Sequence, residues 1–131
     1  MLKMSFEHRH KVLLASFSAA LTQGDLGRYD REVGRFVARW RDPVRGILDF
    51  THISKIEVTS EQVAGRGQQP QVNPGQQRVY VAPTPEMYGL CRMFAAYQAF
   101  QGFPEADIVR SMQEACALLC IDQPTFEPVD P

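Results

Sequence analysis

The stretch that most constrains the fold is residues 46–60, GILDFTHISKIEVTS. Ile47, Leu48 and Phe50 stand together among few charges, so residues 46–51 are predicted to form a strand that is buried on both faces. Strands of this kind lie in the middle of a sheet that is flanked by helices. We therefore expect an α/β fold with residues 46–51 as its central strand.

A helix start follows this strand closely. Thr59, or Ser60 beside it, can act as N-cap, and Thr59 with Gln62 three residues later has the form of a capping box. We expect the helix to be short and to end at Ala64-Gly65. The junction between a strand and a helix N-terminus is where an open α/β sheet usually carries its site.

Length and charge restrict the class of protein. The chain has 131 residues, 44% of them hydrophobic, which suits one domain spanning residues 1–131. Fourteen basic and fifteen acidic residues give a net charge of −1, so no overall field favours nucleic acid or an anionic membrane. No apolar run approaches the roughly 18 to 20 residues that span a bilayer, and the first residues lack a signal-peptide core. These features predict a cytoplasmic protein without integral membrane association.

The first 18 residues are predicted to form two short strands, residues 2–7 and 11–18, around a polar turn. The second has apolar residues on both alternating sets, so we expect it inside the sheet and the first strand at an edge. His8 and His10 would point to the same side of a strand, as two metal ligands might. No third ligand is in view, so we expect no metal.

A long helix is predicted up to Trp40, with Thr22 or Asp25 as its N-cap. Its apolar stripe is expected to cover one face of the sheet. The opposite side carries a basic stripe, which is either a solvated face or a site for an anion or acidic partner. The apolar stripe is Leu26, Tyr29, Val33, Phe36, Val37 and Trp40, and the basic stripe is Arg28, Arg31, Arg35 and Arg39.

The second half of the chain continues the alternation of strands and helices. Residues 65–77 are predicted to be a mobile surface loop, followed by a buried strand at residues 78–82. A helix is expected over residues 85–101, with Thr84 as N-cap and Pro85 in the first position. A last strand at residues 107–110 and a helix opened by a capping box of Ser111 and Glu114 precede an extended tail at residues 122–131.

The helix over residues 85–101 has an apolar arc too wide for one sheet face. The excess flank is either covered by residues 65–77 or the C-terminal tail, or buried against a second copy of the chain. We expect a homodimer through this flank. The interface residues are Gly89, Met93, Ala96 and Phe100.

Three cysteines, Cys91, Cys116 and Cys120, each stand in an apolar helical setting. Their number is odd, and a helix holds residues four apart without favouring a disulfide. We interpret all three as buried, reduced thiols, with a redox or metal role as the alternative.

The resulting order is β-β-α-β-α-β-α-β-α, which predicts a largely parallel sheet of about five strands with an antiparallel edge. In ILDFTHISKIEVTS, VYVAPTPEMYGLCRMF and IVRSMQEACALL the chain resembles the SpoIIAA-like, or STAS, superfamily, especially its little-characterised bacterial members. The resemblance covers nearly the whole chain. It implies a single SpoIIAA-like domain.

Anti-sigma factor antagonists of this superfamily carry Asp-Ser-Ser/Thr-Gly after the central strand, and the first Ser is phosphorylated. The matching run here is Glu57-Val58-Thr59-Ser60, so Val58 takes the place of the phosphoacceptor and Thr59 that of the second hydroxyl residue. The resemblance therefore implies no phosphorylation switch of the familiar kind.

Two functions remain open. The first is a non-enzymatic interaction or regulatory module that acts through protein partners. The second is a small-molecule or lipid-binding domain, with a pocket near Glu57, Thr59, Ser60 and Thr84 where free backbone N–H groups could hold an anion. The sequence has no glycine-rich phosphate loop, no catalytic Cys-His or Ser-His-Asp order and no metal spacing, so catalytic residues, cofactors and a metal are not expected, although an enzyme remains possible.

Overall fold

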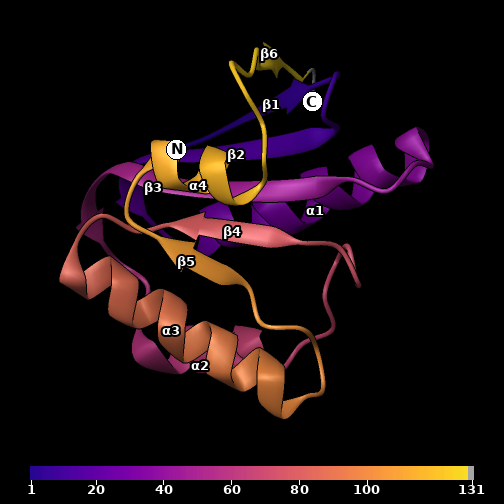
Figure 1. The fold of residues 1–131 in the computed structure, drawn as a ribbon. Helices are drawn as coiled ribbons and strands as arrows, with labels where there is room; N and C mark the ends of the chain where they lie inside the picture. The colour runs from indigo at the N-terminus through magenta and orange to yellow at the C-terminus, as the bar shows by residue number, and fades with distance from the viewer. Residues whose placement is uncertain (130–131) are drawn as a thin grey trace.

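A computed structural model describes residues 1–129 of the chain (Figure 1). In this part of the chain one six-stranded sheet has the order β5-β4-β3-β2-β1-β6. Strands β2 to β5 run parallel to one another, and β1 lies antiparallel to both β2 and β6. The elements are β1 (Leu2–Glu7), β2 (Val12–Leu21), α1 (Gln23–Trp40), β3 (Arg45–Ile56), α2 (Ser60–Gly67), β4 (Arg78–Val81), α3 (Pro85–Phe100), β5 (Asp107–Val109), α4 (Met112–Leu118) and β6 (Glu127–Pro128).

The predicted class and order of elements are confirmed, and β3 lies beside β2 in the middle of the sheet. Some details were wrong. Strand β3 continues five residues beyond Thr51, because its second half still pairs with the end of β2. Strand β1 is not at the edge, because the C-terminal tail adds β6 outside it. Helix α2 runs past Ala64-Gly65 to Gly67.

Alternating side chains of the sheet divide between two cores. On one face Phe17, Leu48 and Tyr80 are buried under α1, α2 and α3. On the other face Ile47 and Val79 are buried under α4 and the segment that follows it. In the two strands predicted to be buried, five apolar side chains are at most 6% exposed, namely Ile47, Leu48, Phe50, Val79 and Val81.

Local capping explains where the helices begin. Thr22 caps α1 in a reciprocal capping box with Asp25, which settles the choice between these two residues. Ser111 caps α4, but the Glu114 carboxylate accepts from the backbone of Arg110 at 2.7 Å instead of returning to Ser111. The capping box predicted for α4 is therefore only half formed.

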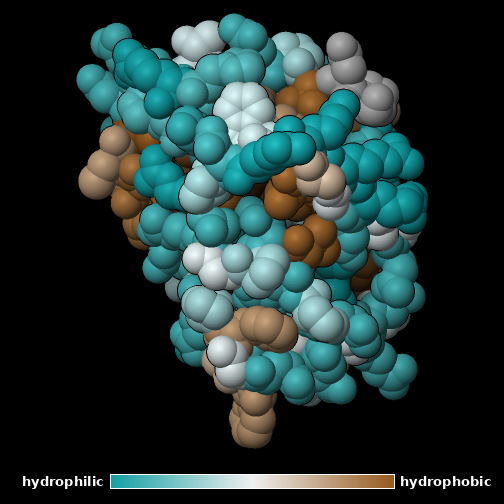
Figure 2. All heavy atoms as spheres, turned by 90° about the vertical axis from the view of Figure 1, so that its right-hand side faces the viewer, coloured by the Kyte–Doolittle hydropathy of each residue, from teal (hydrophilic) through white to brown (hydrophobic). Residues whose placement is uncertain are grey.

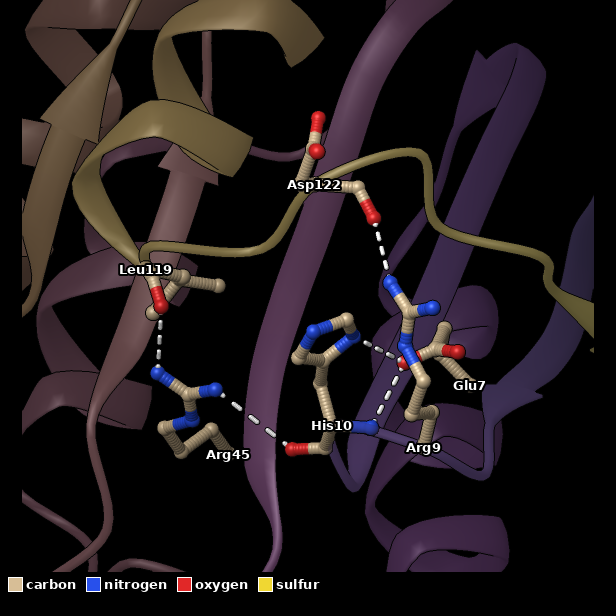
Figure 3. A network of polar contacts seen from close by, with 6 residues as sticks. All are labelled: Glu7, Arg9, His10, Arg45, Leu119 and Asp122. Carbon is tan, nitrogen blue, oxygen red and sulfur yellow. Dashed lines mark hydrogen bonds and ion pairs between the residues drawn. The ribbon is translucent and has the colours of Figure 1, made fainter.

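Two arginine side chains fasten the C-terminal segment to the sheet, and the Glu7 carboxylate holds the turn after β1 (Figure 3). Arg45 Nη1 donates to the carbonyl of Leu119 at 2.7 Å, and Arg9 Nη2 donates to that of Asp122 at 2.8 Å. Glu7, only 4% exposed, accepts from the backbone N–H of His10 and contacts its Nδ1, both at 2.7 Å. The tail predicted to be extended pairs with β1 through β6; residues 130 and 131 lie outside the described part.

The cysteines have three different environments. Cys91 is buried, Cys116 is partly buried and Cys120 is exposed. The prediction of three buried thiols was therefore wrong for Cys120, which follows α4 in a turn with a positive φ of 58°. It was right for Cys91, whose pKa is raised to about 12 by burial.

Candidate functional site after the central strand

The loop between β3 and α2 is three residues long, because β3 extends to Ile56. The backbone N–H of Glu57 donates to the carbonyl of Leu21 at 2.9 Å, and its carboxylate lies 3.2 Å from Lys55 Nζ. Val58 is 7% exposed and belongs to the core beneath the helices. The position that the resemblance assigns to a phosphoacceptor is thus filled by a side chain turned inward.

Thr59 is committed to its own helix. Its hydroxyl accepts from the backbone N–H of Gln62 at 3.1 Å, and the Gln62 side chain accepts from the backbone of Thr59 at 3.0 Å. The predicted capping box is confirmed. Ser60, the first residue of α2, is exposed.

Thr84 has the same role at α3. Its hydroxyl accepts from the backbone N–H of Met87 at 3.2 Å, and Pro85 stands in the first turn as predicted. A groove of about 390 Å³ brings Thr84 and Glu86 close to residues 53–56 at the end of β3. Glu57, Thr59 and Ser60 are not among the residues that line it. Binding of an anion by these four residues stays a prediction.

The flank of α3 is exposed at the positions predicted for an interface. Phe100 is 91% exposed, and Ala96 and Gly89 are exposed as well. A Cβ added at Gly89 would meet no atom within 4 Å, whereas Met93 is partly buried against the core. Figure 2 shows an apolar side chain projecting at the lower end of the molecule, where α3 ends in Figure 1. Within residues 1–129, neither the loop after α2 nor the C-terminal segment covers this flank.

The two histidines considered as metal ligands have separate partners. His8 stacks edge-on against Phe6 and Trp40, while His10 contacts Glu7 on the other face of the sheet. Among residues 1–129 no three or more His, Cys, Asp or Glu side chains are placed to hold a metal ion. In the same range no helix has the length and apolar character needed to cross a membrane.

The basic stripe of α1 is solvent-exposed along its length. Arg28 Nε lies 2.9 Å from Glu32 Oε1, so Glu32 neutralises the first arginine of the stripe. This agrees with the reading as a solvated face, while binding of an acidic partner stays a prediction. The stripe is Arg28, Arg31, Arg35 and Arg39.

Comparison with known proteins bears on the fold. No family model and no curated protein matches the sequence. Among solved structures, the anti-sigma factor antagonist SpoIIAA in its unphosphorylated form superposes with a TM-score of 0.55 at 12% identity. The match covers 89% of this chain and 94% of that one. The protein has a SpoIIAA-like fold.

The SpoIIAA-like fold accounts for the position of the loop after β3 but does not transfer an activity at this identity. Sequence reasoning missed a polar cavity between the helices and the sheet. Tyr29, Arg66, Arg78 and Gln98 converge on this cavity, which residues 69–73 also line. The one available signal was Gln98, a polar residue on the otherwise apolar buried face of α3.

Proposed function

We propose that this protein is a non-enzymatic interaction or regulatory module that acts through protein partners and self-associates through α3. The observation that carries the proposal is the uncovered apolar flank of α3, with Phe100 91% exposed. Aromatic side chains are enriched at protein interfaces relative to the rest of the surface. The SpoIIAA-like fold supports this proposal because the superposed structure is that of an anti-sigma factor antagonist, a regulatory protein.

The size of the flank limits the affinity. Burying one Phe removes roughly 150 to 250 Å² from water, whereas a stable interface buries about 800 Å² on each partner. The flank is therefore the centre of a larger, mostly polar contact. We expect association in the micromolar range, with two-fold symmetry that sets α3 against its copy.

Sedimentation equilibrium tests self-association. The wild type should be dimeric at tens of micromolar, and the double variant Ala96→Glu, Phe100→Glu should be monomeric because it places charges at the interface core. Both positions are exposed, so the variant should remain folded. Leu118→Glu, at a position 38% exposed on α4, is the matched control and should stay dimeric. A monomeric wild type at this concentration would refute the proposal.

Regulation by phosphorylation is not part of this proposal. Val58 cannot accept a phosphate, and the Thr59 hydroxyl already serves as an N-cap. Incubation with bacterial lysate and ATP should therefore leave residues 57–60 unmodified in a mass spectrum. Stoichiometric phosphate on Thr59 or Ser60 would restore the switch.

A small-molecule or lipid-binding function is the second candidate, supported by the groove between residues 53–56 and Thr84. Lys55 and Glu86 both line this groove, so its charge is mixed. A thermal-shift screen against anionic metabolites and lipids separates the candidates, because only the second predicts stabilisation by a small molecule. A pull-down from lysate is the parallel assay for the first.

A further inference from the structure

Two adjoining cavities lie between the sheet and the three helices that cover it. The first is polar, has a volume of about 70 Å³ and is lined in part by residues 69–73 of the segment that joins α2 to β4, which lies at the right of Figure 1. The second is an apolar chamber with a volume of about 50 Å³. Tyr29, Arg66 and Arg78 line both. Since roughly 10 to 15 Å³ suffices for one water, each cavity has room for more than a single water.

Gln98, one of the residues that line the polar cavity, has an unpaired side-chain oxygen. The residue is 2% exposed, and its Nε2 donates to the carbonyls of Gly67 at 2.6 Å and Gln69 at 3.1 Å. Both partners are acceptors, so the orientation of the amide is fixed. Its Oε1 is buried and has no hydrogen-bond partner among residues 1–129. A buried carbonyl without a donor is unfavourable, and a ligand that donates a hydrogen bond would remove this cost.

A second unpaired group lines the same cavity. Gln71 Nε2 is buried without an acceptor in the described part of the chain. Two residues that line the cavity thus carry unpaired polar atoms, an acceptor on Gln98 and a donor on Gln71. A ligand with both a hydroxyl and a carbonyl or carboxylate oxygen would satisfy both.

The charge of the lining favours an anion. Arg66 is neutralised by Asp30 through two hydrogen bonds of 2.5 and 2.7 Å. Arg78 lies over the ring of Tyr80 at 5.8 Å, and no described carboxylate lies within ion-pair distance of it. Burial raises the pKa of Tyr29 and of Tyr80, so neither phenol supplies a negative charge at neutral pH. One positive charge is left over, which matches a monoanion better than a phosphate dianion.

We propose that these cavities bind a small organic acid. Its carboxylate pairs with Arg78, a neighbouring hydroxyl donates to Gln98 Oε1, and a short apolar tail occupies the chamber. The chamber suits a branched aliphatic group because Leu48, Phe50, Leu90 and Phe94 line it. This site is distinct from the groove at Thr84 and does not depend on the α3 flank.

The test is a titration of the ¹⁵N-labelled full chain followed by NMR, with the side-chain amides of Gln71 and Gln98 as reporters. The probe is 2-hydroxy-4-methylpentanoate, which carries all three groups. It should shift both amide signals in a saturable manner. The corresponding acid without the hydroxyl should bind several-fold more weakly, and the alcohol without the carboxylate about tenfold or more weakly, because a charge-assisted hydrogen bond is lost.

Two arginine variants assign the charge. Arg78→Gln should weaken binding of the probe by about tenfold or more. Arg92→Gln, at an exposed position on α3 that does not line either cavity, should leave binding unchanged. The probe series on the wild type remains decisive if Arg78→Gln does not fold. Absence of saturable shifts, equal binding of acid and alcohol, or wild-type affinity in Arg78→Gln would overturn the proposal. Sedimentation of the ligand-free protein tests self-association independently.

Discussion

The contact between α2 and α3 leads to a sharp test at Gly67, the last residue of α2. A Cβ added there would lie 2.5 Å from the Cβ of Tyr97 and 3.4 Å from the carbonyl oxygen of Phe94. Neither neighbour is the end of a flexible side chain, so rotamer changes cannot relieve the overlap. Ordinary contact begins near 3.4 Å, so Gly67→Ala requires the two helices to separate by about 1 Å.

The cost follows from overpacking. Forced backbone shifts of this kind destabilise by typically 1 to 3 kcal/mol, occasionally more. The greater helix propensity of Ala offsets up to about 1 kcal/mol. We expect Gly67→Ala to lose about 1 to 2 kcal/mol of unfolding free energy, which lowers Tm by several degrees for a chain of this size. Urea denaturation followed by circular dichroism measures the loss.

Gly65→Ala is the matched control in the same helix. No atom lies within 4 Å of the added Cβ, so only the propensity gain remains and this variant should be stabilised by up to about 1 kcal/mol. The two Gly→Ala changes should thus have opposite signs. If Gly67→Ala is as stable as Gly65→Ala, the close approach of α2 and α3 is wrong.

Three further outcomes are expected. Leu48→Asp should abolish cooperative thermal unfolding, since an unpaired charge in the core costs several kcal/mol; a variant that melts like the parent would remove β3 from the core. Burial raises the pKa of Glu7, but the hydrogen bonds from His10 outweigh this effect, so the pKa lies below the ordinary 4.5. The wild type should therefore lose stability as the pH falls below 4.5 and through the pKa of the folded state. Glu7→Gln should flatten this loss in urea titrations, and an identical pH profile would argue against the contact. Iodoacetamide at pH 8 should modify the exposed Cys120 first and Cys91 only on unfolding, because burial raises the pKa of Cys91 to about 12; peptide mass spectrometry showing early labelling of Cys91 would contradict this.

The sequence predicted most of the fold because its signals are local. The caps at Thr22, Thr59 and Thr84 depend on hydrogen bonds within three residues, and the buried strands on uninterrupted apolar runs. The error about the edge of the sheet has a different origin. Strand β6 forms because Val129 donates to the carbonyl of Met4, a contact between the two ends of the chain that no local pattern encodes.

The cavity lined by residues 69–73 could not be predicted for the same reason. Arg78 opens β4, Tyr29 lies on α1 and Gln98 lies on α3, so only the tertiary fold brings them together. In the sequence, the segment before Arg78 has the glycine, proline and glutamine content of a mobile loop. Gln98 instead holds the start of this segment, because its side-chain amide donates to the carbonyls of Gly67 and Gln69.

Helix α3 serves both proposals with opposite faces. Gln98 is 2% exposed and faces the cavity, and Phe100, two residues later, is 91% exposed on the flank. Residues two apart on a helix do not share a face, so the Ala96→Glu, Phe100→Glu variant can lose the dimer and keep the ligand site. If the ligand does alter the dimer constant, thermodynamic linkage requires dimerisation to alter the ligand affinity by the same factor. Measuring the dimerisation constant and the ligand affinity therefore decides whether the two sites on α3 are energetically coupled or independent.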